Sequence, residues 1–212
     1  MRFTATLSGW LCALLGLIVV SSSLSYANTA TRDRLIADAT RLGGTVEFDE
    51  KLPGRPIVRV DLHGTQVTDS DLAMFEYAKN DLKQLRYLDL RLTQISDDGV
   101  AKLRNLRQLQ TLNLFRTRLG DKGLAQLKQL TDLRALLIGG TRVTDAGLVH
   151  LRRFRKLRKL SLFQTPVSDN GIAELKRISS LEVVLISGSK ITPAGADELQ
   201  RALPRVSFKE DN

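Results

Sequence analysis

The residues best suited to chemistry in this chain are two aspartates and a histidine near the start of a repeating pattern. Asp61 and His63 lie two residues apart, and Asp89 follows Asp61 by 28 residues, which is one repeat later. Side by side, the three could form a metal site or an acid–base pair. Arg59 and Arg91 fall in the same patch, where ordinary charge pairing accounts for the group equally well. We therefore expect no metal, no cofactor and no catalytic residue.

The sequence also lacks the familiar motifs of catalysis. It contains no G-x-S-x-G, no H-E-x-x-H and no phosphate-binding loop. The single cysteine, Cys12, lies in an apolar N-terminal run, so the remainder of the chain has no thiol for disulfides, thiolate chemistry or a cysteine-based metal site. Five of the repeats keep one length, without an insertion large enough to build a pocket. These observations favour binding over catalysis.

Aromatic side chains form a second candidate site. Phe115 and Phe163 flank Gly139 at spacings of 24 residues, with Leu137 and Leu185 at adjacent positions. Two rings that stand two strands apart in a parallel sheet would be separated by about 9–10 Å. A gap of that width above a glycine could hold an apolar or planar group of a partner. The alternative is that the rings pack on neighbouring side chains and only cover the sheet.

A dense run of positive charge forms a third candidate. Its cationic residues are Arg152, Arg153, Arg155, Lys156, Arg158 and Lys159. The run falls at the expected end of a helix, where the helix dipole favours cations, so a solvated edge is one interpretation. The other is a salt-sensitive contact with a polyanion, such as acidic polysaccharide, lipid head groups or an acidic protein. The chain carries a formal charge of +9, but nothing in it resembles a nucleic-acid-binding motif, and we expect no nucleic acid.

The elements that must position these residues follow from an internal repeat of 24 residues. One column of the repeat is Leu85, Leu109, Leu133, Leu157 and Leu181, and another is Gly99, Gly123, Gly147, Gly171 and Gly195. The alternation of Leu88 and Leu90 predicts a short strand, and the three-residue spacing of Val100, Leu103 and Leu106 predicts one face of a helix. Each unit is therefore expected to be a strand, a turn and a short helix.

Several residues between the strand and the helix predict where each helix begins. Good N-cap residues recur there as Ser96, Thr144, Ser168 and Thr192. Asp97, Asp145 and Asp169 follow in the first turn, where the helix dipole favours negative charge. Pro193 suits a first helical position, which needs no N–H donor.

Residues 85–95 read L-R-Y-L-D-L-R-L-T-Q-I, which resembles the leucine-rich repeat pattern L-x-x-L-x-L-x-x-N-x-L. Thr93 stands where the family usually has Asn, whose side chain bonds to the backbone of neighbouring turns. We expect the threonine column to do the same with one hydroxyl. The following T-x-[VIL]-[ST]-D-x-G is similar to small exported bacterial repeat proteins, and also to F-box adaptors, although this chain has no F-box region. The resemblance covers roughly residues 57–203.

The first residues have the pattern of a secretory signal peptide. Arg2 precedes an apolar run from Trp10 to Val20, and Ser25 and Ala27 place small residues before a cut that would follow Ala27. The run is shorter than the roughly 20 residues of a membrane-spanning helix, which makes a signal anchor the less favoured alternative. We expect export to the periplasm or the extracellular space, with no membrane span after cleavage.

The resemblance implies an α/β leucine-rich repeat horseshoe solenoid, with a parallel sheet on the concave face and short helices on the convex face. The expected organisation is a signal peptide over 1–27, an N-terminal cap of a helix and a short strand over 28–56, six repeats over 57–203, and a closing strand and tail over 204–212. Strand residues between the leucines would face the concave surface.

The expected function is that of a monomeric, non-catalytic recognition module. It would bind a protein or polysaccharide outside the cytoplasm through the concave face. Partner contacts are expected at Tyr87, Arg91, Phe115, Leu137, Gly139, Phe163 and Leu185. The alternatives are an architectural or self-assembling envelope protein, and polyanion binding through the basic edge over 152–159.

Overall fold

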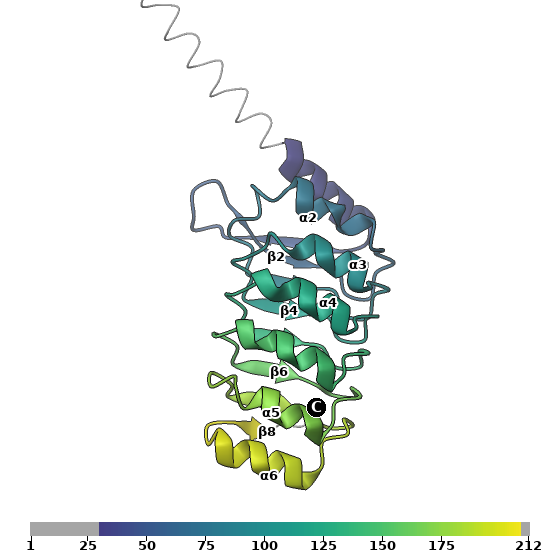
Figure 1. Cartoon of the computed structure of the whole chain (residues 1–212). Coiled ribbons are helices and arrows are strands. Elements are labelled where there is room, and N and C mark those ends of the chain that lie inside the picture. Colours follow the sequence, from purple (N-terminus) through teal and green to yellow (C-terminus); the bar gives the residue numbers. More distant parts are fainter. Residues whose placement is uncertain (1–29, 209–212) are drawn as a thin grey trace, which may run out of the picture.

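The computed structural model describes residues 30–208, which form a stack of strands covered on one face by helices (Figure 1). Eight strands make one sheet in the order of the sequence. They are β1 (Thr45–Phe48), β2 (Ile57–Asp61), β3 (Tyr87–Asp89), β4 (Thr111–Asn113), β5 (Ala135–Leu137), β6 (Lys159–Ser161), β7 (Val183–Leu185) and β8 (Ser207–Phe208). The predicted α/β leucine-rich repeat solenoid with a parallel sheet is confirmed.

The register of the sheet follows the repeat. From β2 to β8 all neighbouring strands are parallel, and residues of one column pair with one another, as Tyr87 does with Thr111 and Thr111 with Ala135. β1 differs because it runs antiparallel to β2. The predicted signal peptide and the last residues of the predicted tail lie outside the described residues. Within residues 30–208, no helix is long and apolar enough to cross a membrane.

The helical segments are short, and many are 3₁₀ rather than α. Residues 30–41 form a helix at the N-terminal end of the stack. The others are η1 (Asp71–Ala73), α2 (Met74–Tyr77), α3 (Asp97–Val100), η2 (Ala101–Leu103), α4 (Asp121–Gln126), η3 (Leu127–Gln129), η4 (Asp145–Arg153), η5 (Asp169–Gly171), α5 (Ile172–Leu175) and α6 (Pro193–Ala202). A 3₁₀ helix rises about 2.0 Å per residue against 1.5 Å for an α-helix, so it spans the width of the stack with fewer residues.

The predicted helix starts are confirmed. Ser96, Thr144 and Ser168 each accept a hydrogen bond from the backbone N–H two residues later. Thr192 accepts from the N–H of Gly195, and Pro193 occupies the first turn of α6. These bonds satisfy N–H groups that a helix leaves unpaired at its beginning.

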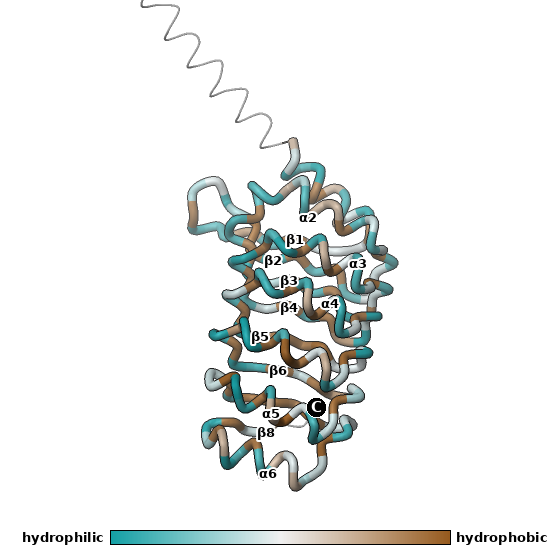
Figure 2. Tube along the Cα trace, in the orientation of Figure 1, coloured by the Kyte–Doolittle hydropathy of each residue, from teal (hydrophilic) through white to brown (hydrophobic). Residues whose placement is uncertain are grey.

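The core lies between the sheet and the helices. The leucine columns of the repeat are buried along its whole length. Figure 2 shows apolar segments that recur from unit to unit. Phe75 and Phe154 are among the largest fully buried side chains and extend the core toward the helical layer. Apolar burial of this kind is continuous from unit to unit, because each unit covers only part of its own apolar surface.

The threonine column is buried but does not connect neighbouring turns. The Thr93 hydroxyl donates to the carbonyl of Leu90 at 2.6 Å, and Thr117, Thr141 and Thr165 make the same bond to the residue three positions before. The prediction that threonine would replace the family's asparagine between turns was wrong. A threonine hydroxyl is too short to reach the next turn, so it satisfies a carbonyl of its own turn instead.

Aspartates connect the neighbouring turns. Asp121 accepts the backbone N–H of Thr144 at 2.8 Å and its hydroxyl at 2.7 Å. The same arrangement joins Asp69 to Ser96, Asp145 to Ser168 and Asp169 to Thr192. Each carboxylate therefore contacts the N-cap residue of the following unit, a connection between units that the sequence did not predict.

This aspartate column also explains the glycine column. A Cβ atom on Gly147 would overlap the carboxylate of Asp121, and the carboxylate of the preceding unit obstructs Gly99, Gly123, Gly171 and Gly195 in the same way. Glycine is required there for space, since the carboxylate lies against its α-carbon.

Candidate binding surface on the sheet

The two phenylalanines on the open face of the sheet contact each other. The ring centroids of Phe115 and Phe163 are 6.0 Å apart, with their planes at 38°. Phe115 follows β4 and Phe163 follows β6, and the backbone of residues 139–140, which follows β5, is hydrogen-bonded between them. Both rings therefore lean over Gly139 and close the predicted gap of about 9–10 Å. Of the two interpretations of these rings, the structure therefore shows packing on neighbouring side chains and no slot for a planar group between them.

Gly139 permits this contact because it has no side chain. A Cβ atom there would lie 3.0 Å from Cδ2 of Phe115 and 3.1 Å from Cβ of Phe163. Aromatic pairs at this separation gain about 0.5–1.5 kcal/mol beyond the burial of their surface. The glycine is buried beneath the pair, so it shapes the surface without offering atoms to a partner.

A shallow pocket of about 400 Å³ lies beside the ring pair. It is lined by Arg91, Asn113, Phe115, Arg116, Leu137, Lys159, Ser161 and Phe163. We call this group the sheet pocket. Three of its lining side chains are cationic and none is acidic, and its volume falls in the usual range for ligand-binding clefts.

Two predicted contact residues behave differently from one another at the pocket. Leu137 is half-buried and lines the sheet pocket. Leu185 is only 3% exposed and does not line it. Leu185 is therefore too well covered in this structure to offer a partner much contact area.

The hydroxyl of Ser161 is the most unusual polar group of the sheet pocket. Ser161 is 3% exposed, and its Oγ has no hydrogen-bond partner within the described residues. Most buried hydroxyls in proteins are hydrogen-bonded, because leaving one unpaired costs about 1–3 kcal/mol. An unpaired hydroxyl in the wall of a pocket is well placed to bond to a ligand.

The polar cluster at the first two repeats is a network of charge pairs. The guanidinium of Arg59 lies 3.7 Å from the centre of the Tyr87 ring and 3.2 Å from a carboxylate oxygen of Asp61. Asp61 also accepts from the backbone N–H of His63 and lies 2.7 Å from its Nδ1 atom. Within residues 30–208, no group of three potential ligands could hold a metal ion.

Tyr87, a predicted partner contact, belongs to this network and does not line the sheet pocket. Its hydroxyl donates to Asp89 at 3.0 Å, and the Asp89 carboxylate also accepts from Asn113 at 3.2 Å. Burial, together with the Asp89 carboxylate, raises the pKa of Tyr87. Arg91 pairs with the same carboxylate at 3.6 Å but keeps a partly exposed side chain at the sheet pocket.

The basic run is divided by the fold. Arg152 pairs with Glu174, Lys156 with Asp132 and Arg158 with Glu182. Arg153 and Arg155 make no ion pair within the described residues, and together with Arg152 and Lys156 they line a second hollow near the end of η4. Lys159 starts β6 and lines the sheet pocket instead. Four of the six cations therefore share one hollow, and Lys159 lies apart from them.

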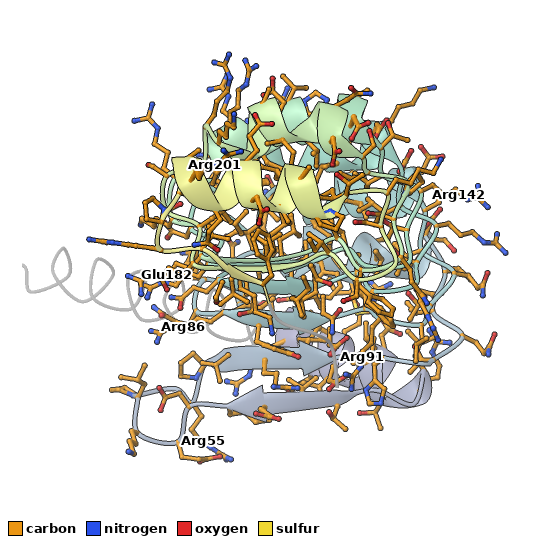
Figure 3. The ribbon with its side chains drawn as sticks, turned by 90° about the horizontal axis from the view of Figure 1, so that it is seen from below. Arg55, Arg86, Arg91, Arg142, Glu182 and Arg201 are labelled. Carbon is orange, nitrogen blue, oxygen red and sulfur yellow. The ribbon has the colours of Figure 1, made fainter. Side chains whose placement is uncertain are left out.

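Figure 3 shows how charged side chains surround the sheet. Arg86 and Glu182 extend from the edge where the strands begin, whereas Arg142 extends from the opposite edge. Arg201 lies in the helical layer on the far side. The sheet is therefore bordered by charged side chains, and the phenylalanine pair lies just beyond the ends of β4 and β6.

Comparisons with known proteins place these observations in a family. The family described as Leucine Rich repeat matches residues 83–103 and 105–127, which are two consecutive units of the 24-residue pattern. The chain is a leucine-rich repeat protein. Among curated proteins, no sequence matches this leucine-rich repeat protein.

The fold of this leucine-rich repeat protein is similar to the crystal structure of an internalin from Listeria monocytogenes. The TM-score is 0.52 at 18% sequence identity, and the match covers 75% of this chain and 51% of that chain. The chain thus spans about half the length of the internalin. At this identity the likeness concerns the fold.

Sequence reasoning missed three residues of this leucine-rich repeat protein that line the sheet pocket. Arg116 follows Phe115 in the turn that closes β4, outside the columns expected to face a partner. Asn113 and Ser161 lie between strand leucines, where residues were expected to face the concave surface, but the sequence alone did not show that Ser161 is buried and unpaired. Lys159 was assigned to the basic run because of its neighbours in sequence.

Proposed function

We propose that this leucine-rich repeat protein is a non-catalytic recognition module that binds a protein partner outside the cytoplasm through the open face of its sheet. The observation that carries the proposal is the sheet pocket beside the Phe115–Phe163 pair. Exposed aromatic rings next to arginine are the composition in which binding hot spots are enriched. The solenoid behind them is held by repeated bonds between units, so the surface is rigid before a partner arrives.

The polar residues of the sheet support binding over catalysis. Asp61 pairs with Arg59, and Asp89 accepts from Tyr87 and pairs with Arg91. A catalytic acid or base needs reach to a substrate proton, and these groups are already occupied. Polysaccharide is the alternative ligand class for the same face, since phenyl rings also stack on sugar rings.

Export is the second part of the proposal. It rests on Arg2, the apolar run over 10–20 and the small residues Ser25 and Ala27. Sequencing the N-terminus of the protein recovered from the periplasm or the medium tests it directly. A chain that begins at Asn28 agrees with cleavage of a signal peptide, and an intact chain in the cytoplasm contradicts export.

Capture at two salt concentrations tests which surface of the protein binds the partner. The purified protein is immobilised and exposed to the exported and surface fraction of the producing cell, alongside Phe115→Ala and an Arg153→Gln/Arg155→Gln variant. We expect one protein to be retained at both salt concentrations by the wild type and the arginine variant, and to be lost with Phe115→Ala. Retention that disappears at high salt and with the arginine variant would instead assign binding to the basic edge.

Self-assembly is distinguished by mass. An architectural protein would increase in mass with concentration in sedimentation experiments, whereas a recognition module stays monomeric until its partner is added. Concentration-dependent assembly that Phe115→Ala leaves unchanged would contradict the proposed function.

A further inference from the structure

We propose that the sheet pocket binds a carboxylate of the partner, beside an apolar side chain that packs on the phenylalanine pair. This inference rests on the proposed function and specifies the chemistry that the surface recognises. The carboxylate can come from an acidic side chain or from the end of a chain, and the experiment below separates these sources.

The charge of the sheet pocket carries the first step. Arg116 and Lys159 are exposed, and neither makes an ion pair within the described residues. Within residues 30–208, the only polar contact of the Arg116 side chain is a long one, 3.5 Å from Nη2 to the amide oxygen of Gln164. Arg91 adds a third cation, partly balanced by Asp89. Since no acidic residue lines the pocket, its field attracts an anion.

The unpaired hydroxyl of Ser161 carries the second step. It is buried in the wall of the sheet pocket without a protein partner. A hydroxyl can donate to a carboxylate oxygen, and a hydrogen bond to a charged acceptor is worth more than one to a neutral group. The cations attract the anion, and Ser161 offers a bond at a defined position.

The backbone beside Ser161 carries the third step. In the first three repeats, the N–H two residues after the strand end is bonded by a side-chain oxygen, from Asp61, Asp89 or Asn113. At the equivalent position of the fifth repeat, the N–H of Phe163 has no protein acceptor within the described residues. A carboxylate from a partner can take the place that the aspartate oxygen takes in the earlier repeats.

The ring pair defines the neighbour of the carboxylate. Phe115 and Phe163 line the same pocket and are both half-exposed, so an apolar side chain next to the acidic group can cover them. The guanidinium of Arg116 lies 5.1 Å from the centre of the Phe115 ring, which brings charge and apolar surface within the reach of one dipeptide. A segment with an acidic residue followed by an aromatic one fits this arrangement.

Three capped peptides test the inference without knowledge of the natural partner. They are acetyl-Gly-Glu-Phe-Gly-amide, its neutral analogue acetyl-Gly-Gln-Phe-Gly-amide, and acetyl-Gly-Gln-Phe with a free C-terminal carboxylate. Binding is followed by NMR through the backbone amide signals of Phe163 and its neighbours. We expect at least one of the two carboxylate peptides to bind about tenfold or more tightly than the neutral analogue, with the stronger one identifying the source of the carboxylate.

Matched variants assign the effect to the pocket. Lys159→Gln and Ser161→Ala should each weaken binding of the carboxylate peptide several-fold and leave the affinity for the neutral peptide unchanged. Lys128→Gln, which removes an exposed lysine from the helical layer, should change neither. Equal affinity of charged and neutral peptides, or no binding of any of the three, overturns the carboxylate site.

The outcomes also separate this inference from the proposed function. Peptides that bind equally whether charged or neutral, and only with Phe115 intact, would overturn the carboxylate site and keep the open face as a protein-binding surface. Binding of a sulfated oligosaccharide in place of all three peptides would overturn the carboxylate site and the protein partner together.

Discussion

The rings of Phe115 and Phe163 touch across an intervening strand, with their centroids 6.0 Å apart. Residues two strands apart normally lie about 9–10 Å from each other, so the contact requires both rings to lean inward. They can do so because Gly139 leaves the space between them empty of side-chain atoms. One glycine thereby joins three repeats into a single apolar surface beside the sheet pocket.

Gly139→Ala should disturb this surface and the stability of the fold together. The new methyl group would lie 3.0 Å from the Phe115 ring and from the carbonyl oxygen of Phe163, so the neighbours must move. Overpacking of this kind typically costs about 1–3 kcal/mol. We expect a lower midpoint of urea unfolding and a changed near-ultraviolet circular dichroism spectrum. An unaltered spectrum and midpoint would contradict the ring contact.

Gly120→Ser should stabilise the protein. Gly120 occupies the N-cap position where other repeats have Ser or Thr, and its extended backbone suits any residue. A Cβ atom there would lie 3.3 Å from a carboxylate oxygen of Asp97, which must move slightly to accept it. Its N–H bonds to Asp97 at 2.6 Å, but the hydroxyl bond made in the other repeats is missing. Restoring it should add about 1 kcal/mol to the free energy of unfolding.

Gly120→Ala is the matched control for that gain, since it adds the Cβ atom without the hydroxyl. We expect its unfolding midpoint to lie well below that of Gly120→Ser. Combining Gly120→Ser with Asp97→Ala should abolish the gain, because the acceptor is gone. Equal stabilisation by Ser and Ala would show that the hydroxyl bond contributes nothing.

Tyr77 should make stability depend on alkaline pH. Burial, followed by its hydrogen bond to Asp38 at 2.6 Å, raises the pKa of Tyr77 from 10.0 to about 12. Because the folded state holds this proton more tightly, the stabilisation is complete below pH 10 and is lost as the pH rises from 10 toward 12. In Tyr77→Phe, the free energy of unfolding should depend less on pH over that window.

Ultraviolet titration of the phenols checks this directly. We expect a step near pH 12 in the wild type, and that step to be absent in Tyr77→Phe and retained in Tyr87→Phe. A wild type in which every tyrosine ionises near pH 10 would contradict the Tyr77–Asp38 bond.

Asp71 should make stability depend on acidic pH. The Thr68 hydroxyl donates to its carboxylate at 2.6 Å and lowers the pKa of Asp71 below 3.8, while burial opposes the shift. Because the pKa of Asp71 is lowered in the folded state, its carboxylate stabilises the fold at pH values above 3.8. This contribution is lost as the pH falls below 3.8 and through the folded-state pKa. Thr68→Val should raise the pKa of Asp71 toward 3.8, measured by carbon NMR titration, whereas Thr131→Val at an exposed site should not.

The repeat made much of the fold predictable. Leu88 and Leu90 indicate a strand because alternate residues face the core, and Ser96 indicates a helix start because its hydroxyl is the right length for a cap. Both conclusions depend on residues close together in sequence. The register of the sheet then followed, because identical columns must align when equal units stack.

The contacts between units were harder to predict. Asp121 and Thr144 are 23 residues apart, and their bond depends on the offset between neighbouring turns, which the repeat length alone does not define. The ring contact depends on which way two side chains lean. Ser161 looked like any outward-facing serine, because its burial depends on how the side chains of neighbouring units lie, which the repeat pattern does not define.

Photo-crosslinking from the open face tests the central claim most directly. Phe163 is replaced by a benzophenone-bearing phenylalanine, and the same group is placed at Val149, an exposed apolar residue of the helical layer. Irradiation in the presence of the exported fraction should join a specific protein to position 163 and none to position 149. A protein joined only from position 149, with no product from position 163, would contradict recognition through the open face of the sheet.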